Sequence, residues 1–179
     1  MSECLPFKAD RQAKGNLRSV IAYILVLAKN LHLLFMEKFS TYDLITQVVN
    51  KLFVYTDLQD WDKLQNEVFT NQVLFDMTSA GGEKLDTTAE KICEMWSDGF
   101  AGIDSVNHLA GNYLVEIQDD TATVFAYATA THYKKSATNG NTREFIGTYN
   151  LHLTKKGRGW RIDEFTYNLK YINGNTDLT

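Results

Sequence analysis

Residues 121–133 read TATVFAYATATHY, and the side chains of this stretch alternate between two kinds with unusual regularity. One set is small or apolar and ends at His132, and the other set carries threonines and large aromatic rings. Because successive side chains of a strand point to opposite faces of a sheet, the pattern predicts one long strand with a face in the core. His132 shares its face with the small residues.

Shorter stretches on either side of this strand also alternate, and polar turns separate them. A two-residue period around 113–117 leads to a turn at Asp119–Asp120, and a polar loop over 134–143 follows the long strand. The later predicted strands cover 144–154 and 160–171, so the second half of the chain is expected to form an antiparallel sheet.

Helical signals fill the chain ahead of the strands. Ser40, Asp60 and Thr87 are candidate N-caps, and apolar residues follow each of them at helical spacing. The first helix should run from about Thr41 to Thr56, which places Asp57 near the junction of two helices. About three N-terminal helices followed by long strands predict an α+β fold, with the helices packed on one face of a strongly curved, mostly antiparallel sheet.

The composition sets limits on the class of protein. With 179 residues, of which 44% are hydrophobic, the chain suits one globular domain. A net charge of -4 and scattered basic residues give no surface for a phosphate backbone, so nucleic acid is not an expected partner. The common nucleotide-binding and nucleophile motifs are absent from the sequence.

The first 38 residues are predicted to be an extension to a domain that covers 39–179. Four basic residues precede apolar runs over 20–28 and 31–36, which are too short and too broken to span a bilayer. The extension could be a signal peptide without a clear cleavage site, an additional packing helix, or a segment ahead of a start at Met36. No membrane association is expected.

Cysteine usage favours a reduced, cytoplasmic setting. Cys4 and Cys93 lie in unlike contexts, and neither has the spacing of a zinc site. Cys93 falls on an apolar helical stripe, which predicts a buried thiol rather than a reactive one.

Asp57, His108 and His132 are the residues that suggest chemistry. Histidine titrates near neutral pH, and a partly buried aspartate can fix its tautomer and stabilise its charged form, so the three suit proton transfer. Separation in the sequence does not show that they meet. Taken singly, Asp57 could be a helix-end carboxylate, and each histidine could be an ordinary strand residue.

The order of several short motifs resembles the SnoaL-like family of the nuclear transport factor 2-like superfamily. The resemblance covers about Phe39 to Tyr171 and implies a cone-shaped α+β barrel. The motifs that carry it are Tyr55/Asp57/Asp60/Trp61, His108-Leu109-Ala110-Gly111-Asn112, Asp120-Thr121-Ala122, His132, Gly147-Thr148-Tyr149 and Gly159-Trp160-Arg161-Ile162.

Within that superfamily the site pattern looks most like scytalone dehydratase, in which an aspartate and two histidines form the catalytic centre. The resemblance places Asp57, His108 and His132 in those roles. It places the dehydratase's pocket serine and asparagine on Thr148 and Asn150. Bile-acid dehydratases similarly pair an aspartate and a histidine at Asp57 and His108.

The chain departs from these relatives at the residues that polarise a carbonyl. The two tyrosines of scytalone dehydratase would fall on Thr56 and Met77, and the tyrosine of the bile-acid enzymes would fall on Leu52. None of these side chains replaces a phenol. The resemblance therefore implies that this protein keeps the acid/base residues of these relatives but acts on a different substrate.

The expected function is that of a cofactor-independent lyase or isomerase, which dehydrates or isomerises a small hydroxy- or keto-compound. The resemblance implies no metal, although one aspartate and two histidines could form a facial triad. The alternative is a noncatalytic small-molecule-binding or dimerisation module of the same fold, and a homodimer is expected in either case. The candidate substrate-binding residues are Tyr55, Asn112, Thr148, Tyr149 and Asn150.

One ambiguity concerns the strand over 144–154. Alternation allows either Thr148 and Asn150 or Tyr149 and Leu151 to face the cavity, but not both pairs. The resemblance favours the polar pair. Tyr149 could instead bury its ring in the core or at a dimer interface.

Overall fold

The computed structural model describes residues 23–25 and 39–179. The elements that matter for function all lie in one compact unit, Ser40–Thr179. The predicted extension falls mostly outside the described residues, so its boundary at residue 38 stays a prediction. Within the described ranges, no helix has the length and apolar character needed to cross a membrane.

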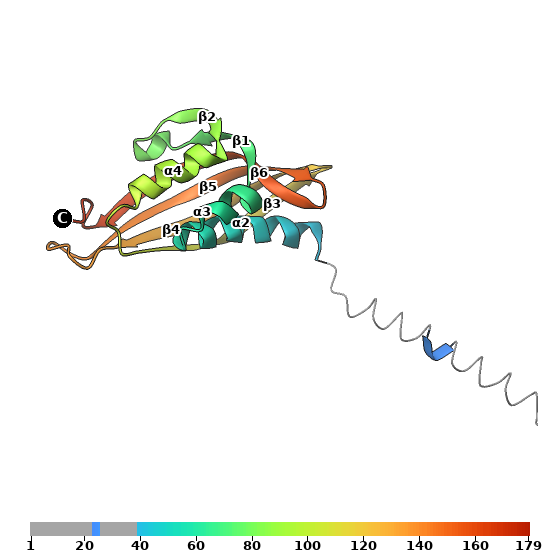
Figure 1. Cartoon of the computed structure of the whole chain (residues 1–179), viewed down its shortest axis with the longest axis horizontal. Coiled ribbons are helices and arrows are strands. Elements are labelled where there is room, and N and C mark those ends of the chain that lie inside the picture. The colour runs from blue at the N-terminus through green and yellow to red at the C-terminus, as the bar shows by residue number, and fades with distance from the viewer. Residues whose placement is uncertain (1–22, 26–38) are drawn as a thin grey trace, which may run out of the picture. The chain divides into compact units, whose positions relative to one another are not determined.

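Helices precede most of the strands, as the sequence predicts (Figure 1). The elements are α2 (Thr41–Asp57), α3 (Trp61–Lys63), the π-helix η1 (Leu64–Val68), β1 (Phe69–Asp76), the 3-10 helix η2 (Thr78–Ala80), β2 (Lys84–Thr88), α4 (Ala89–Gly99), β3 (Ser105–Gln118), β4 (Thr121–Tyr133), β5 (Thr142–Lys156) and β6 (Gly159–Gly174).

The strands form one six-stranded sheet in the order β2-β1-β6-β5-β4-β3. Every neighbouring pair is antiparallel except β1 and β6, which run parallel. The sheet curves around the helices without closing on itself (Figure 1). The predicted α+β class, with helices on one face of a curved and mostly antiparallel sheet, is confirmed.

Helix α2 begins and ends where local chemistry dictates. Ser40 accepts a hydrogen bond from the Asp43 amide, and the Asp43 carboxylate accepts one from Ser40 in return, which completes a capping box. The helix then buries one apolar face and ends at Asp57, because Gln59 takes a left-handed backbone with φ of 53°. The Asp57 carboxylate consequently stands at the end of a rigid element.

Strands β1 and β2 were not predicted. In β1 the exposed pair Asn71–Gln72 interrupts the alternation, and β2 is a short edge strand with mostly exposed side chains. Neither gives the two-residue period that identified β4. On β4 the predicted inner face is buried throughout, and Cys93 on α4 is buried as its stripe predicted.

Candidate active site

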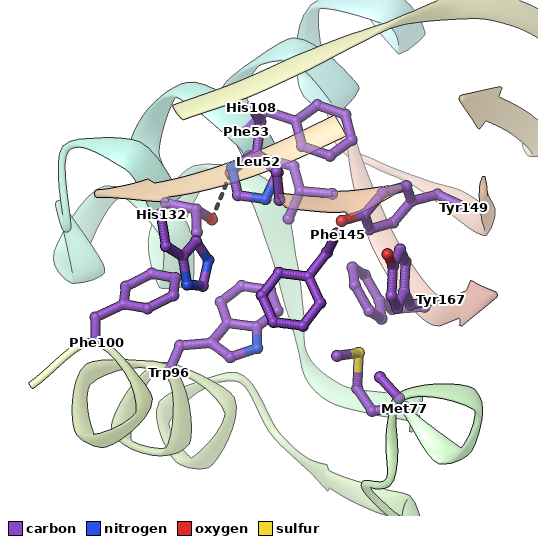
Figure 2. Close-up of a pocket in the computed structure, with 14 residues that line it drawn as sticks. Leu52, Phe53, Met77, Trp96, Phe100, His108, His132, Phe145, Tyr149 and Tyr167 are labelled. Carbon is purple, nitrogen blue, oxygen red and sulfur yellow. Dashed lines mark hydrogen bonds between the residues drawn. The ribbon is translucent and has the colours of Figure 1, made fainter. Parts of the chain in front are cut away.

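A cavity of about 230 Å³ lies between the helices and the inner face of the sheet. Its walls are mostly aromatic and aliphatic, with two histidines and two tyrosines among them (Figure 2). The lining residues are Leu52, Phe53, Thr56, Met77, Ala80, Trp96, Phe100, His108, Ala130, His132, Phe145, Tyr149, Phe165 and Tyr167. Such a cavity suits a small, largely apolar ligand with a few oxygen atoms.

Asp57 holds His108 at two points. One carboxylate oxygen lies 2.5 Å from Nδ1 of the His108 ring, and the other accepts a hydrogen bond from the His108 backbone amide at 2.9 Å. Because an ionised carboxylate only accepts, Nδ1 carries the proton and Nε2 keeps its lone pair. His108 lines the cavity, and its side chain is only 8% exposed, so the ring is shielded from bulk solvent.

Arg143 holds His132 in the opposite tautomer. Arg143 donates from Nε and Nη2 to Nδ1 of His132, over 3.3 and 3.2 Å. A guanidinium has no acceptor, so Nδ1 must carry the lone pair and Nε2 the proton. Burial, followed by the charge of Arg143, lowers the pKa of His132 from 6.5 to about 4. At neutral pH His132 is therefore a neutral N–H donor and not an acid.

The register of the sheet brings the two histidines to one wall. His108 of β3 pairs with Ala130 of β4, and His132 lies two residues further along the same face of β4. Figure 2 shows both rings at one side of the cavity, away from Tyr149 and Tyr167. The structure thus brings together the three side chains proposed for catalysis.

Two of the other predicted residues lie away from the cavity. The Tyr55 hydroxyl donates to the Glu67 carboxylate, which also pairs with Lys51. Tyr55 is therefore engaged away from His108. Asn112 takes a left-handed backbone, with φ of 56°, at a bulge in β3, and it is not a wall residue. Neither residue is placed to contact a ligand there.

The preference for Thr148 and Asn150 as cavity residues is wrong. Tyr149 lines the cavity, whereas Asn150 is exposed and lies beside an open groove on the other face of the sheet. Thr148 is buried but is not a wall residue either.

Small side chains on β4 explain why Tyr149, rather than Thr148 or Asn150, faces the cavity. Ala126 pairs with Tyr149, and Ala130 pairs with Phe145, so each large ring of β5 faces a small partner across the strands. Placing the polar pair inward would leave the space over these alanines unfilled.

Several residues of the site carried no signal of function in the sequence. Arg143 falls in a segment predicted as loop, and Tyr167 reads as one of several aromatic strand residues. Leu52, Thr56 and Met77, the positions at which the resemblance implies tyrosines, do line the cavity. The Thr56 hydroxyl donates to the Leu52 carbonyl of its own helix. The phenols of this cavity come instead from β5 and β6.

Metal ligation has no obvious place in the described residues. Among residues 23–25 and 39–179, no three histidine, cysteine, aspartate or glutamate side chains are grouped closely enough to hold an ion. Nδ1 of His108 is paired with Asp57, and Nδ1 of His132 is paired with Arg143.

Solved structures with the same fold are numerous, and three illustrate their range. Kfla4162 protein from Kribbella flavida is 20% identical with a TM-score of 0.70, over 75% of this chain and 93% of that one. A putative scytalone dehydratase from Novosphingobium aromaticivorans is 12% identical with a TM-score of 0.64, over 74% and 85%. Hexachlorocyclohexane dehydrochlorinase LinA-type3 from Novosphingobium barchaimii is 10% identical with a TM-score of 0.61, over 74% and 88%.

At these identities the structural matches establish the fold alone. The comparison with curated proteins found no match. The SnoaL-like domain family, however, matches residues 37–166, which is most of the chain. The protein therefore belongs to the SnoaL-like domain family.

Proposed function

We propose that this protein is a cofactor-independent lyase or isomerase that acts on a small hydroxy- or keto-compound by general acid/base catalysis. The observation that carries the proposal is the Asp57–His108 pair, whose free Nε2 belongs to a wall of an apolar cavity. A histidine oriented by a carboxylate in a water-poor site is a competent general base near neutral pH. The dehydratase and dehydrochlorinase named among the solved structures make eliminations a natural class to test first.

In the proposed dehydration, Nε2 of His108 takes the proton next to a carbonyl group. The electrons of that C–H bond form the new C=C bond as the C–O bond of the β-hydroxyl breaks. The proton then leaves His108 with the hydroxyl group as water, which restores the neutral imidazole. Isomerisation shares the first step and returns the proton to a different carbon.

The other polar groups hold oxygen atoms during this cycle. His132 donates from Nε2 to the departing hydroxyl without changing its own charge, because Arg143 occupies Nδ1. Tyr149 donates to the carbonyl oxygen, and in Figure 2 its hydroxyl is directed toward the centre of the cavity.

The test is a screen of aromatic β-hydroxy ketones, beginning with 4-hydroxy-4-phenylbutan-2-one, whose enone product is detected by its absorbance. Asp57→Asn should lower kcat/KM by about 10²- to 10⁴-fold, because the ring loses its fixed tautomer. Asp163→Asn is the matched control, since Asp163 bonds His152 outside the cavity. Equal kcat/KM values for Asp57→Asn and wild type would overturn the proposal.

The alternative is a binding module without turnover, and the large apolar share of the cavity wall is what favours it. Such a module should bind its ligand equally well after Asp57→Asn and His108→Gln. We also propose a homodimer, because Leu109, Leu114 and Tyr127 are exposed on β3 and β4, and sedimentation analysis of the full chain tests it. The cytoplasmic location stays a prediction.

A further inference from the structure

Tyr167 lines the cavity, yet its hydroxyl has no hydrogen-bond partner. It is the one buried side-chain polar atom in residues 23–25 and 39–179 that is left unpaired, and the residue is only 4% exposed. Such groups are rare in folded proteins, because a buried donor without a partner destabilises the protein. A phenol of this kind beside a cavity points to a partner that arrives with the ligand.

The backbone at Tyr167 is held by Ser79. Ser79 of η2 donates its hydroxyl to the Tyr167 carbonyl at 2.6 Å and accepts from the Leu169 amide at 2.8 Å. This single side chain joins η2 to β6 at Tyr167 and at the residue two positions after it. The phenol is therefore held in place without any bond of its own.

The sequence also leaves space for the Tyr167 ring. A Cβ atom at Gly147 would lie 2.6 Å from both Cε2 and the hydroxyl oxygen of Tyr167. Any other residue at position 147 would displace the ring or its backbone. Glycine at this point of β5 is thus matched to the position of the phenol.

We propose that the Tyr167 hydroxyl, together with that of Tyr149, binds an oxygen atom of the ligand inside the cavity. Tyr149 and Tyr167 pair across β5 and β6 with ring centroids 4.9 Å apart. In Figure 2 the Tyr167 hydroxyl points toward Tyr149, on the side of the cavity away from the histidines.

Both phenols remain donors at physiological pH. Burial raises the pKa of Tyr167 to about 12. Burial, with smaller effects from Tyr167 and Asp57, raises the pKa of Tyr149 further above its ordinary value. Neutral phenols suit a carbonyl oxygen, whose partial charge grows when an adjacent proton is removed. This assignment rests on the proposed function, because it supplies the carbonyl site for that chemistry.

The experiment measures binding rather than turnover, so that it is separate from the test of Asp57. Full-length wild type and Tyr167→Phe are titrated by calorimetry with 4-phenylbutan-2-one and with butylbenzene, which lacks the carbonyl. Wild type should prefer the ketone, and Tyr167→Phe should reduce that preference by roughly three- to tenfold while binding butylbenzene unchanged. Tyr171→Phe is the control, because Tyr171 is an exposed tyrosine on the same strand.

An unchanged ketone preference in Tyr167→Phe would overturn the proposal, as would a wild-type protein without any preference for the ketone. In both cases a loss of turnover in Asp57→Asn would still support the proposed function. Thermal unfolding gives a second readout. Without ligand, the Tm of Tyr167→Phe should equal or exceed that of wild type, since only an unpaired hydroxyl is removed. A Tm lower by more than about 5 °C would reveal a structural partner and contradict the assignment.

Discussion

Two aspartate–histidine pairs in this protein have nearly the same geometry in very different surroundings. The Oδ1–Nδ1 distance is 2.5 Å between Asp57 and His108 and 2.6 Å between Asp163 and His152. The side chains of the first pair are 19% and 8% exposed, and those of the second are 29% and 30% exposed. The contact between carboxylate and imidazole is therefore the same in both pairs, and only the surroundings differ.

Three differences separate the inner pair from the outer pair. The inner aspartate ends a capped helix and also accepts from the His108 backbone, so the histidine is fixed at two points. His108 packs against Phe53, with ring centroids 5.4 Å apart, and lines an apolar cavity. His152 instead lies beside an open groove, where water competes for its ring. Only the inner pair combines a fixed tautomer with a dry site for a ligand.

Replacing each histidine by glutamine should give the largest contrast between the pairs. His108→Gln removes the proposed base and should lower kcat/KM by about 10³-fold or more, because an amide cannot take up the proton. His152→Gln should stay within about twofold of wild type, since its ring lies outside the cavity. Steady-state kinetics on the substrate found by the β-hydroxy ketone screen measures both. Comparable losses in the two variants would show that the cavity is not the catalytic site.

The free energy of unfolding of the protein should depend on pH through His132. Its pKa is about 4 in the folded protein and near 6.5 when unfolded, so the unfolded state binds more protons between these values. The free energy of unfolding should therefore fall as the pH drops from about 6.5 to about 4, with roughly 3 kcal/mol arising from His132. Urea titrations at several pH values measure this slope.

His132→Gln provides the control for that slope. The variant removes the titrating ring, so its unfolding free energy should vary less over the same pH range than that of wild type. An identical slope in wild type and His132→Gln would contradict the neutral, buried state of this histidine.

Much of the fold could be predicted because its signals are local. The capping box at Ser40 and Asp43 fixes the start of α2, and the alternation over Thr121–Tyr133 identifies β4 and its buried face. Strand β1 could not be found in this way, since its Asn71–Gln72 pair breaks the alternation. Its place is set by pairing with β6, which lies far along the chain.

The site was less predictable because it depends on strand register. Asp57, His108 and His132 could be named as candidates from residue type and resemblance, but only the pairing of β3 with β4 brings the two histidines to one wall. Asp57 of α2 then contacts His108 there. Whether Thr148 or Tyr149 faces the cavity depends on the register of β5, because a shift of one residue moves every side chain to the opposite face of the sheet. Arg143 looked like a loop residue, although it determines the tautomer of His132.

The packing of Tyr167 against β5 should be sensitive to a single methyl group. Gly147→Ala should lower the free energy of unfolding by about 1–3 kcal/mol, because the new Cβ would overlap the Tyr167 ring. Gly111→Ala is the matched control, since a Cβ there meets no atom within 4 Å and β3 already bends at that point. Chemical denaturation compares them, and equal stability of the two variants would mean that the wall is looser than the structure indicates.

The outer pair should give the smallest effect of all. A double-mutant cycle with His152→Gln and Asp163→Asn should yield a coupling free energy below about 1 kcal/mol, because both side chains remain in contact with water. Raising the salt concentration to 1 M should reduce this coupling further, since the Debye length falls to about 3 Å at that ionic strength. A coupling above about 2 kcal/mol that persists in salt would place the outer pair in the same energetic class as a buried one. Surroundings would then not explain the difference between the two pairs, and His152 would need its own test for function.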